Sequence, residues 1–278
     1  MDSSDGTFQT AGQEIYYRCW QPHARPRAVI LLVHGLAEHC GRYEPLARRM
    51  MQENIAVCAL DLPGHGQSSG APCHIQKFEQ LHNSVSELRN RLAQWYPKAP
   101  VFLLGHSMGG LIATGILLRH QDRYAGCILS GPAVRSPLQP PLLQLLVVRL
   151  LSVVAPRARV LGLDPAGVSR DPAVVKNYIA DPLNYSGKVT ARLVTELFSH
   201  MQQALDGAPS ITLPLLILHG GADSMTAPSG STQLHDSATS SDKTLKIYDG
   251  LYHEIFNEPE GPQILNEVAQ WIIARLPS

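Results

Sequence analysis

The sequence has no charge excess of either sign and no long apolar run. Its 23 lysine and arginine residues balance its 23 aspartate and glutamate residues, so its charge favours neither nucleic acid nor a strongly anionic membrane as a partner. No apolar run approaches the ~20 residues that span a bilayer, and the polar, acidic residues 1–6 lack the chemistry of a secretory signal. We therefore expect a cytoplasmic protein that binds no nucleic acid.

Cysteine is also scarce, and its spacing matches no known site. The cysteines form no CxxC pair and no Cys/His arrangement typical of a metal centre. A scattered set of odd number predicts buried or idle thiols in a reducing compartment. The residues concerned are Cys19, Cys40, Cys58, Cys73 and Cys127. We expect no bound metal.

What the sequence does contain is a regular alternation of apolar strands and helices. Continuously apolar segments, typical of strands buried on both faces, are 28–33, 55–60, 101–104, 126–130 and 214–219, with a further strand predicted over 244–248. Helices are predicted over 43–54, 78–95, 110–118 and 262–276. An antiparallel hairpin over 7–20 precedes them. This order predicts an α/β fold with a mostly parallel central sheet flanked by helices.

The alternation stops between residues 132 and 207. This segment has no clear buried strand and contains helical stretches interrupted by proline, over 142–154, 171–183 and 193–201. An insertion of this size between two strands predicts a helical cap, or lid, above the carboxyl ends of the strands, where open α/β sheets place their active sites. The predicted domains are a core of residues 1–131 and 208–278 and an inserted cap of residues 132–207.

A serine between two glycines directly follows the strand over 101–104. In the stretch Gly105–Gly109, Ser107 stands between an apolar strand and an apolar helix. The glycines permit the sharp, strained turn that lifts a serine hydroxyl above the sheet, the geometry called a nucleophile elbow. Ser107 is therefore the candidate nucleophile of a serine hydrolase.

Two later loops carry the partners that a serine nucleophile needs. Asp223 follows the strand over 214–219, and His253 follows the strand over 244–248. Their order along the chain, serine then acid then histidine, is the order of this fold, and both loops lie at the edge of the sheet that carries Ser107. We predict His253 as the base and Asp223 as the acid that orients it. Asp223 as a helix cap and Asp249 or Glu254 as rival acids are the alternatives.

Acyl transfer also needs donors for an oxyanion. The backbone N–H of Met108, directly after the nucleophile, is one candidate, and that of Leu36, in the loop 34–39, is the other. The glycine-rich segment 61–68 lacks a Walker lysine and Rossmann spacing, so we interpret it as a structural turn beside the site.

These motifs together resemble the monoglyceride lipase family of α/β-hydrolases over nearly the whole chain. The segments that carry the resemblance are 34–39 with 41–43, 61–68, 105–110, 221–223, and 242–248 with 250–254. The resemblance implies an α/β-hydrolase fold with a cap, and hydrolysis of monoacylglycerols to glycerol and fatty acid without a cofactor. It also implies that Glu38 contacts the glycerol hydroxyls, and Arg42 and His106 join it as candidate substrate-binding residues. The chain departs from the family at Ala37, where a second glycine is common.

The segment 142–154 is apolar on nearly every face, and two interpretations stay open. It is either buried between cap and core, or exposed, where it lines an acyl channel and rests on membranes or lipid aggregates. A long acyl chain needs an apolar channel that supplies roughly 0.8 kcal/mol per buried CH₂. The segment therefore favours a small-molecule lipid ester as the substrate.

Three competing functions remain. A carboxylesterase for short soluble esters would use the same triad, and so would a lysophospholipase, with Arg149, Arg157 or Arg159 facing its headgroup. The third is a non-catalytic binding protein on the same scaffold. The sequence leaves the oligomeric state open.

Overall fold

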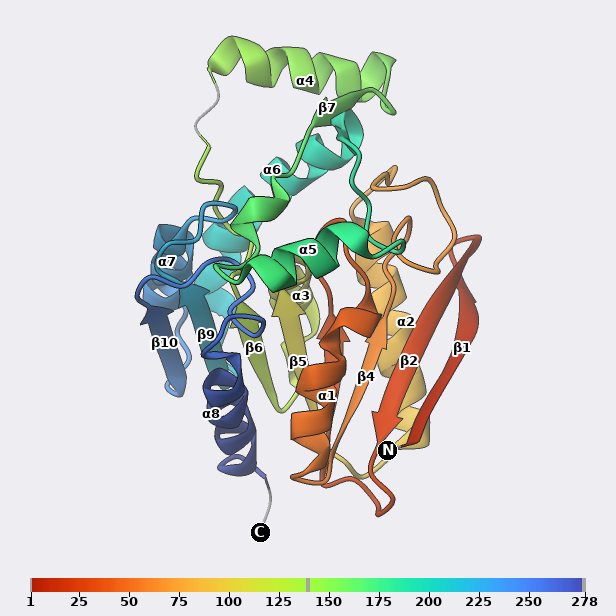
Figure 1. Ribbon diagram of the computed structural model, residues 1–278, viewed down its shortest axis with the longest axis vertical. Helices are drawn as coiled ribbons and strands as arrows, with labels where there is room; N and C mark the ends of the chain where they lie inside the picture. The colour runs from red at the N-terminus through yellow and green to blue at the C-terminus, as the bar shows by residue number, and fades with distance from the viewer. Residues whose placement is uncertain (1, 139–140, 277–278) are drawn as a thin grey trace.

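The centre of the protein is an eight-stranded sheet, seen in a computed structural model that describes residues 2–138 and 141–276 (Figure 1). Its order is β1-β2-β4-β3-β5-β6-β9-β10. The strands are β1 (Asp2–Thr10), β2 (Gln13–Gln21), β3 (Ala28–Val33), β4 (Ile55–Leu60), β5 (Val101–His106), β6 (Gly126–Ser130), β9 (Leu215–Gly220) and β10 (Lys243–Tyr248). The β1–β2 hairpin is antiparallel and β2 pairs antiparallel with β4, whereas the pairs from β4 to β10 are parallel. The predicted α/β fold is confirmed.

Helices cover both faces of the sheet. They are α1 (Glu44–Met51), α2 (Glu79–Trp95), α3 (Met108–His120), α7 (Pro228–Ser237) and α8 (Gly261–Ile273). Leu46 of α1 and Val268 of α8 pack in one apolar cluster, whereas Leu88 of α2, Leu111 of α3 and Leu234 of α7 pack in the other. The inner strands β3, β4, β5, β6 and β9 are mostly apolar because both of their faces are buried, whereas the edge strand β10 is partly exposed. The core elements predicted from hydrophobic periodicity are therefore present, with ends shifted by a few residues.

The chain between β6 and β9 rises above the sheet (Figure 1). It contains α4 (Leu142–Val154), β7 (Arg159–Leu161), α5 (Pro172–Ala180), β8 (Val189–Thr190) and α6 (Ala191–Gly207). This segment also contains short 3-10 turns at Pro165–Gly167 and Ala208–Ser210, and two further turns lie before β6, at Cys40–Tyr43 and Gln121–Arg123. α6 runs from the level of α4 down to α3 and packs against both helices. The antiparallel β7–β8 pair was not predicted, because strands of two and three residues carry no measurable periodicity.

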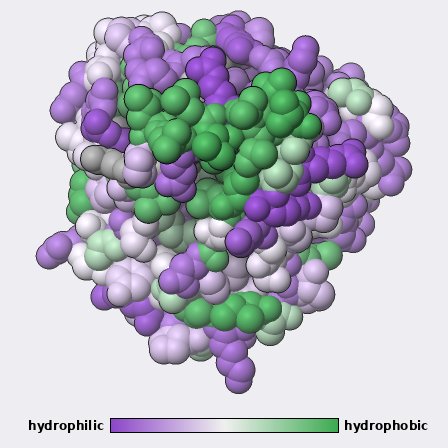
Figure 2. All heavy atoms as spheres, turned by 90° about the horizontal axis from the view of Figure 1, so that it is seen from above, coloured by the Kyte–Doolittle hydropathy of each residue, from purple (hydrophilic) through white to green (hydrophobic). Residues whose placement is uncertain are grey.

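Helix α4 presents most of its apolar side chains to solvent. Leu143 is 73 % exposed and Leu150 is 62 % exposed, whereas Ser152 is the buried residue of the helix. Seen from above, these side chains form a continuous apolar surface (Figure 2). Of the two interpretations of segment 142–154, burial between cap and core is therefore wrong. No helix in the described ranges has the length and apolar character needed to cross a membrane.

The prediction that all the cysteines are thiols is also wrong. Cys19 on β2 lies opposite Cys58 on β4, with the two Cα atoms 4.1 Å apart, and they form a disulfide. Cys40, Cys73 and Cys127 are free and buried. A spacing of 39 residues along the chain gave no sign of this pair, because the strand pairing brings the two residues together. The cysteines therefore no longer support a reducing compartment.

Candidate active site

Ser107 lies in the sharp turn between β5 and α3. Its φ of 55° and ψ of −119° lie in a region that residues with a side chain rarely adopt. The neighbouring glycines are required by space, since a Cβ at Gly105 would collide with the carbonyl of Gly109, and one at Gly109 with the carbonyl of Val33. The predicted elbow geometry is thus present, and the packed layers around the turn hold the backbone in this unfavourable conformation.

The other two predicted triad residues, Asp223 and His253, are joined by a hydrogen bond. Nδ1 of His253 lies 2.6 Å from Oδ2 of Asp223, and both side chains are buried. Ser107 and His253 line the same cavity. Within the described residues no hydrogen bond connects Ser107 to the imidazole, whose hydrogen-bond contacts are with Asp223 and Thr226. Such contacts are often long in free enzymes and tighten when substrate binds.

Asp223 is held by residues that the sequence analysis did not identify. Its Oδ1 accepts the backbone N–H groups of Met225 and Thr226 at 2.7 and 3.0 Å, and its Oδ2 accepts the Thr226 hydroxyl at 2.9 Å. Nε2 of His219 lies 3.1 Å from Oδ2, and Nδ1 of His219 contacts the Ser231 hydroxyl at 2.7 Å. The spacing from Asp223 to Thr226 is typical of an Asx turn and could have revealed that contact. The contacts of His219 depend on the tertiary fold.

These contacts set the charge states of the pair. Burial alone would raise the pKa of Asp223, but the charge of His253 and the hydrogen bonds from His219, His253 and Thr226 hold it well below its usual range. Burial alone has the opposite effect on His253 and would lower its pKa, but the Asp223 carboxylate outweighs burial and raises the pKa of His253. The pKa of His106 is lowered to about 3, mainly by burial and then by His253. The site thus contains one histidine suited to accept a proton and one that stays neutral.

The two predicted oxyanion donors occupy suitable backbone positions. Met108 is the first residue of α3, so its N–H has no acceptor within the helix. Leu36 lies in the loop after β3, and no acceptor for its N–H is found in the described ranges. Ala37 has a φ of 67°, the left-handed region that favours glycine. Ala37 therefore adopts a backbone conformation that is strained for a residue with a side chain.

The loop 34–39 is fixed by the turn that follows β4. The backbone N–H of Leu62 donates to Nε2 of His34 at 2.9 Å, and Nδ1 of His34 contacts the carbonyl of Gly35 at 2.7 Å. The carboxylate of Asp61 accepts backbone N–H groups from Cys40 and Gln67 at 2.8 Å each. The interpretation of segment 61–68 as a structural turn agrees with these contacts.

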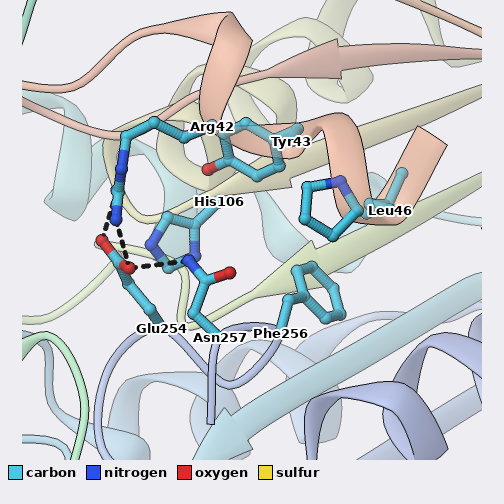
Figure 3. Close-up of a pocket in the computed structure, with 8 residues that line it drawn as sticks. Arg42, Tyr43, Leu46, His106, Glu254, Phe256 and Asn257 are labelled. Atoms are coloured by element: carbon cyan, nitrogen blue, oxygen red, sulfur yellow. Dashed lines mark hydrogen bonds and ion pairs between the residues drawn. The ribbon is translucent and has the colours of Figure 1, made fainter. Parts of the chain in front are cut away.

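Of the candidate substrate-binding residues, Arg42 and His106 line a small pocket of about 10 Å³ (Figure 3), and Glu38 forms an ion pair with Arg42. Arg42 donates to both Glu38 and Glu254, at 2.7 and 2.6 Å. Glu254, considered above as a rival acid, thus faces Arg42 and leaves Asp223 as the partner of His253. Glu38 and His106, but not Arg42, also line the large cavity that contains Ser107.

That cavity has a volume of about 740 Å³, within the range of ligand sites. Ser107, Met108 and His253 lie in its wall beside Leu36. Its apolar lining comes mainly from α4, β7 and α6, through Leu145, Val148, Val160, Leu161, Val194, Leu197, Phe198 and Met201. The segment 132–207 therefore supplies much of the surface against which a substrate would lie.

A serine on an elbow, a buried His–Asp pair and a mostly parallel sheet together define a serine hydrolase of the α/β-hydrolase fold. The family model described as serine aminopeptidase, S33, of the Hydrolase_4 family matches residues 24–260. The chain is 39% identical to a monoacylglycerol lipase of Mycolicibacterium smegmatis, with 95% of each chain covered. It is 35% identical to the human monoglyceride lipase, with 95% of this chain and 88% of the human one covered.

A solved structure agrees with these relatives. The monoacylglycerol lipase of Paleococcus ferrophilus superposes with a TM-score of 0.84 at 31% identity, covering 99% of this chain and 100% of the other. The chain belongs to the monoglyceride lipase family of α/β-hydrolases, and it is a serine hydrolase of the lipase and esterase class.

Proposed function

We propose that this protein hydrolyses monoacylglycerols to glycerol and free fatty acid through an acyl-enzyme on Ser107. The observation that carries the proposal is the 740 Å³ cavity, which combines apolar side chains from α4, β7 and α6 with Ser107 and His253 in one wall. Burying a long acyl chain along such a lining is favourable by roughly 0.8 kcal/mol per CH₂. The names of the family relatives support the same substrate class.

In the proposed mechanism, His253 takes the proton of the Ser107 hydroxyl while Oγ attacks the ester carbonyl carbon. The N–H groups of Leu36 and Met108 stabilise the resulting oxyanion. As the tetrahedral intermediate collapses, the C–O bond to glycerol breaks and the glycerol oxygen takes the proton from His253. Water then attacks the acyl-enzyme, gives a proton to His253, and the fatty acid leaves as the proton returns to Ser107. Asp223 holds the imidazole and stabilises its cation throughout.

In this proposal residues 132–207 form the cap domain and residues 1–131 and 208–278 form the core domain, with residues 1, 139–140 and 277–278 outside the described ranges. The exposed apolar surface of α4 contacts membranes or lipid aggregates, from which a poorly soluble ester enters the cavity. Leu145 and Val148 of the same helix line that cavity, so one element both meets the lipid and guides it inward.

A substrate series tests the proposal. Monoacylglycerols of increasing chain length are compared with p-nitrophenyl and lysophospholipid esters of the same chains, and Ser107→Ala is the inactive control. We expect kcat/KM for monoacylglycerols to rise by about fourfold per CH₂, the equivalent of ~0.8 kcal/mol, until the cavity is filled. An optimum at short soluble esters would indicate a carboxylesterase, and a preference for charged headgroups a lysophospholipase. Failure of Ser107 to react with a fluorophosphonate would contradict catalysis itself.

A further inference from the structure

Arg42 connects the two loops that carry opposite halves of the proposed machinery. Its Nη1 donates to Oε2 of Glu38 at 2.7 Å, and its Nη1 and Nη2 donate to the two oxygens of Glu254 at 2.6 and 2.7 Å. Figure 3 shows the fork of Arg42 facing the Glu254 carboxylate, with His106 beside them. We refer to Glu38, Arg42 and Glu254 as the Arg42 bridge.

One end of the Arg42 bridge reaches the loop of the proposed oxyanion donor. Oε1 of Glu38 accepts the backbone N–H of Gly35 at 2.6 Å and the hydroxyl of Tyr43 at 2.7 Å, while Oε2 accepts from Arg42. Gly35 directly precedes Leu36. The Glu38 side chain is buried, and both of its oxygens are already paired within the protein. It therefore has little capacity left for the hydroxyl groups of a substrate.

The other end reaches the loop of the proposed base. Glu254 directly follows His253, and besides the fork of Arg42 its carboxylate accepts from the Asn257 amide at 2.8 Å. Its backbone N–H donates to the carbonyl of Val168, in the chain between β6 and β9, at 2.8 Å. A shift of Glu254 would carry the His253 backbone with it. Rate constants are sensitive to such shifts, since a misplacement of about 1 Å can cost 10²-fold.

The bridge also has a contact above it. The guanidinium of Arg42 lies 4.6 Å from the centre of the Tyr178 ring, on α5, at cation–π distance. Burial would lower the pKa of Arg42, but Glu38 and Glu254 outweigh burial and raise it. Burial alone would raise the pKa of Glu38, but the charge of Arg42, with smaller contributions from His106, His34 and the Tyr43 hydroxyl, lowers it to about 2. Glu38 and Arg42 are therefore charged, and removing Arg42 would leave the buried side chains of Glu38 and Glu254 without their cationic partner.

We propose that Arg42 is a positioning residue, which holds the Leu36 loop and the His253 loop in register through Glu38 and Glu254, rather than a group that binds the alcohol part of the ester. The inference depends on the proposed triad and oxyanion donors. It explains why the carboxylates of the bridge bind groups of the protein itself: Glu38 binds the N–H of Gly35, the neighbour of Leu36, and Glu254 is the neighbour of His253.

A pair of substrates distinguishes positioning from binding. Arg42→Met and Arg42→Lys are assayed on a monoacylglycerol and on a p-nitrophenyl ester of the same acyl chain, which has no glycerol. We expect Arg42→Met to lower kcat by about 10- to 100-fold on both esters by the same factor, with KM changed less than threefold. Arg42→Lys keeps the charge but loses the planar fork, so we expect partial recovery. A rise in KM for the monoacylglycerol alone would overturn the inference.

Matched variants guard against loss of folding. Arg48→Met removes an exposed arginine that pairs with Glu44 on α1 and should leave both rates unchanged. Glu254→Gln is the milder change to the bridge, with Glu44→Gln as its control. The charged and titratable groups that face His253 are Asp223, Glu254, Glu38 and the neutral His106.

Removing the negative charge of Glu254 lowers the pKa of His253, so His253 stays neutral, and active as a base, to lower pH. We therefore expect Glu254→Gln to move the acid limb of kcat/KM toward lower pH, a shift that a purely structural role would not produce. An unshifted limb in a folded variant would contradict the inference. If Arg42→Met is folded and fully active while Ser107→Ala is inactive, the inference fails alone. If Ser107→Ala is active, the proposed function fails first.

Discussion

The Asp223–His253 pair and helix α4 are opposites in their surroundings. The carboxylate of Asp223 accepts two backbone N–H groups, a hydroxyl and the imidazole of His253, all in a buried environment. Leu143 and Leu150 of α4 have no such partners and face solvent. A group with many directional contacts tolerates little change, whereas an exposed apolar face requires only its hydrophobicity. In the function proposed above, the reaction therefore depends on exact geometry, whereas contact with lipid depends on an apolar surface that can vary in detail.

We expect the largest effect from a variant that breaks the Asp223–His253 pair. Asp223→Asn removes the acceptor that Nδ1–H of His253 needs, so the imidazole takes the wrong tautomer. We expect kcat/KM to fall by about 10⁴, as in other triads. The circular dichroism spectrum should stay the same, because the fold is unchanged. A loss of less than tenfold would show that another acid orients His253.

A second buried histidine shows how hydrogen-bond partners affect the pKa of a buried imidazole. His82 on α2 is as buried as His253, but neither of its ring nitrogens has a hydrogen-bond partner in the described structure. Burial, followed by Arg119, lowers its pKa to about 3. The unfolded chain therefore binds a proton below about pH 6.5 that the folded protein refuses until about pH 3, so stability is lost as pH falls through this window.

His82→Leu should remove this pH dependence. At pH 5 the wild-type side chain favours unfolding by about thirtyfold, or ~2 kcal/mol, and the variant should lose less stability between pH 7.5 and pH 5 by that amount. Urea unfolding at both pH values measures the difference. His235→Gln, at a less buried position on α7, is the control. An equal loss in variant and wild type would mean that His82 does not titrate as its burial implies.

The smallest expected effect lies on the α4 side. The double variant Leu143→Gln, Leu150→Gln reduces the apolar surface without touching the residues that line the cavity. We expect activity on aggregated monoacylglycerol, and binding to vesicles in sedimentation, to fall by about tenfold, or ~1.4 kcal/mol, which is less than the roughly 3–6 kcal/mol that two fully buried leucines contribute, because these side chains are only partly buried on a lipid surface. Activity on a soluble ester should stay the same. Ile247→Gln, an exposed apolar residue on β10, is the matched control, and an equal loss there would argue against a role for α4 in docking.

The strand and helix pattern was predictable because hydrophobic periodicity is a local property. Each continuously apolar segment became a buried strand of the sheet, and the loops after β5, β9 and β10 carry Ser107, Asp223 and His253 to its carboxyl edge. The contacts of His219 and Thr226 with Asp223, and of Arg42 with Glu254, were not predicted. Arg42 and Glu254 are 212 residues apart, and no pattern along the chain shows which charged groups will meet.

The sequence by itself therefore determined the class of chemistry, because parallel strands gather their carboxyl ends at one edge and so place the three loops together. Only the tertiary structure decided which acid faces His253, that Cys19 and Cys58 are bonded, and that α4 is exposed. Each of these depends on distances between segments remote in the chain. The sequence of an apolar helix is the same whether the helix is buried or exposed. Only the packing of the helix against neighbours such as α6 distinguishes the two cases.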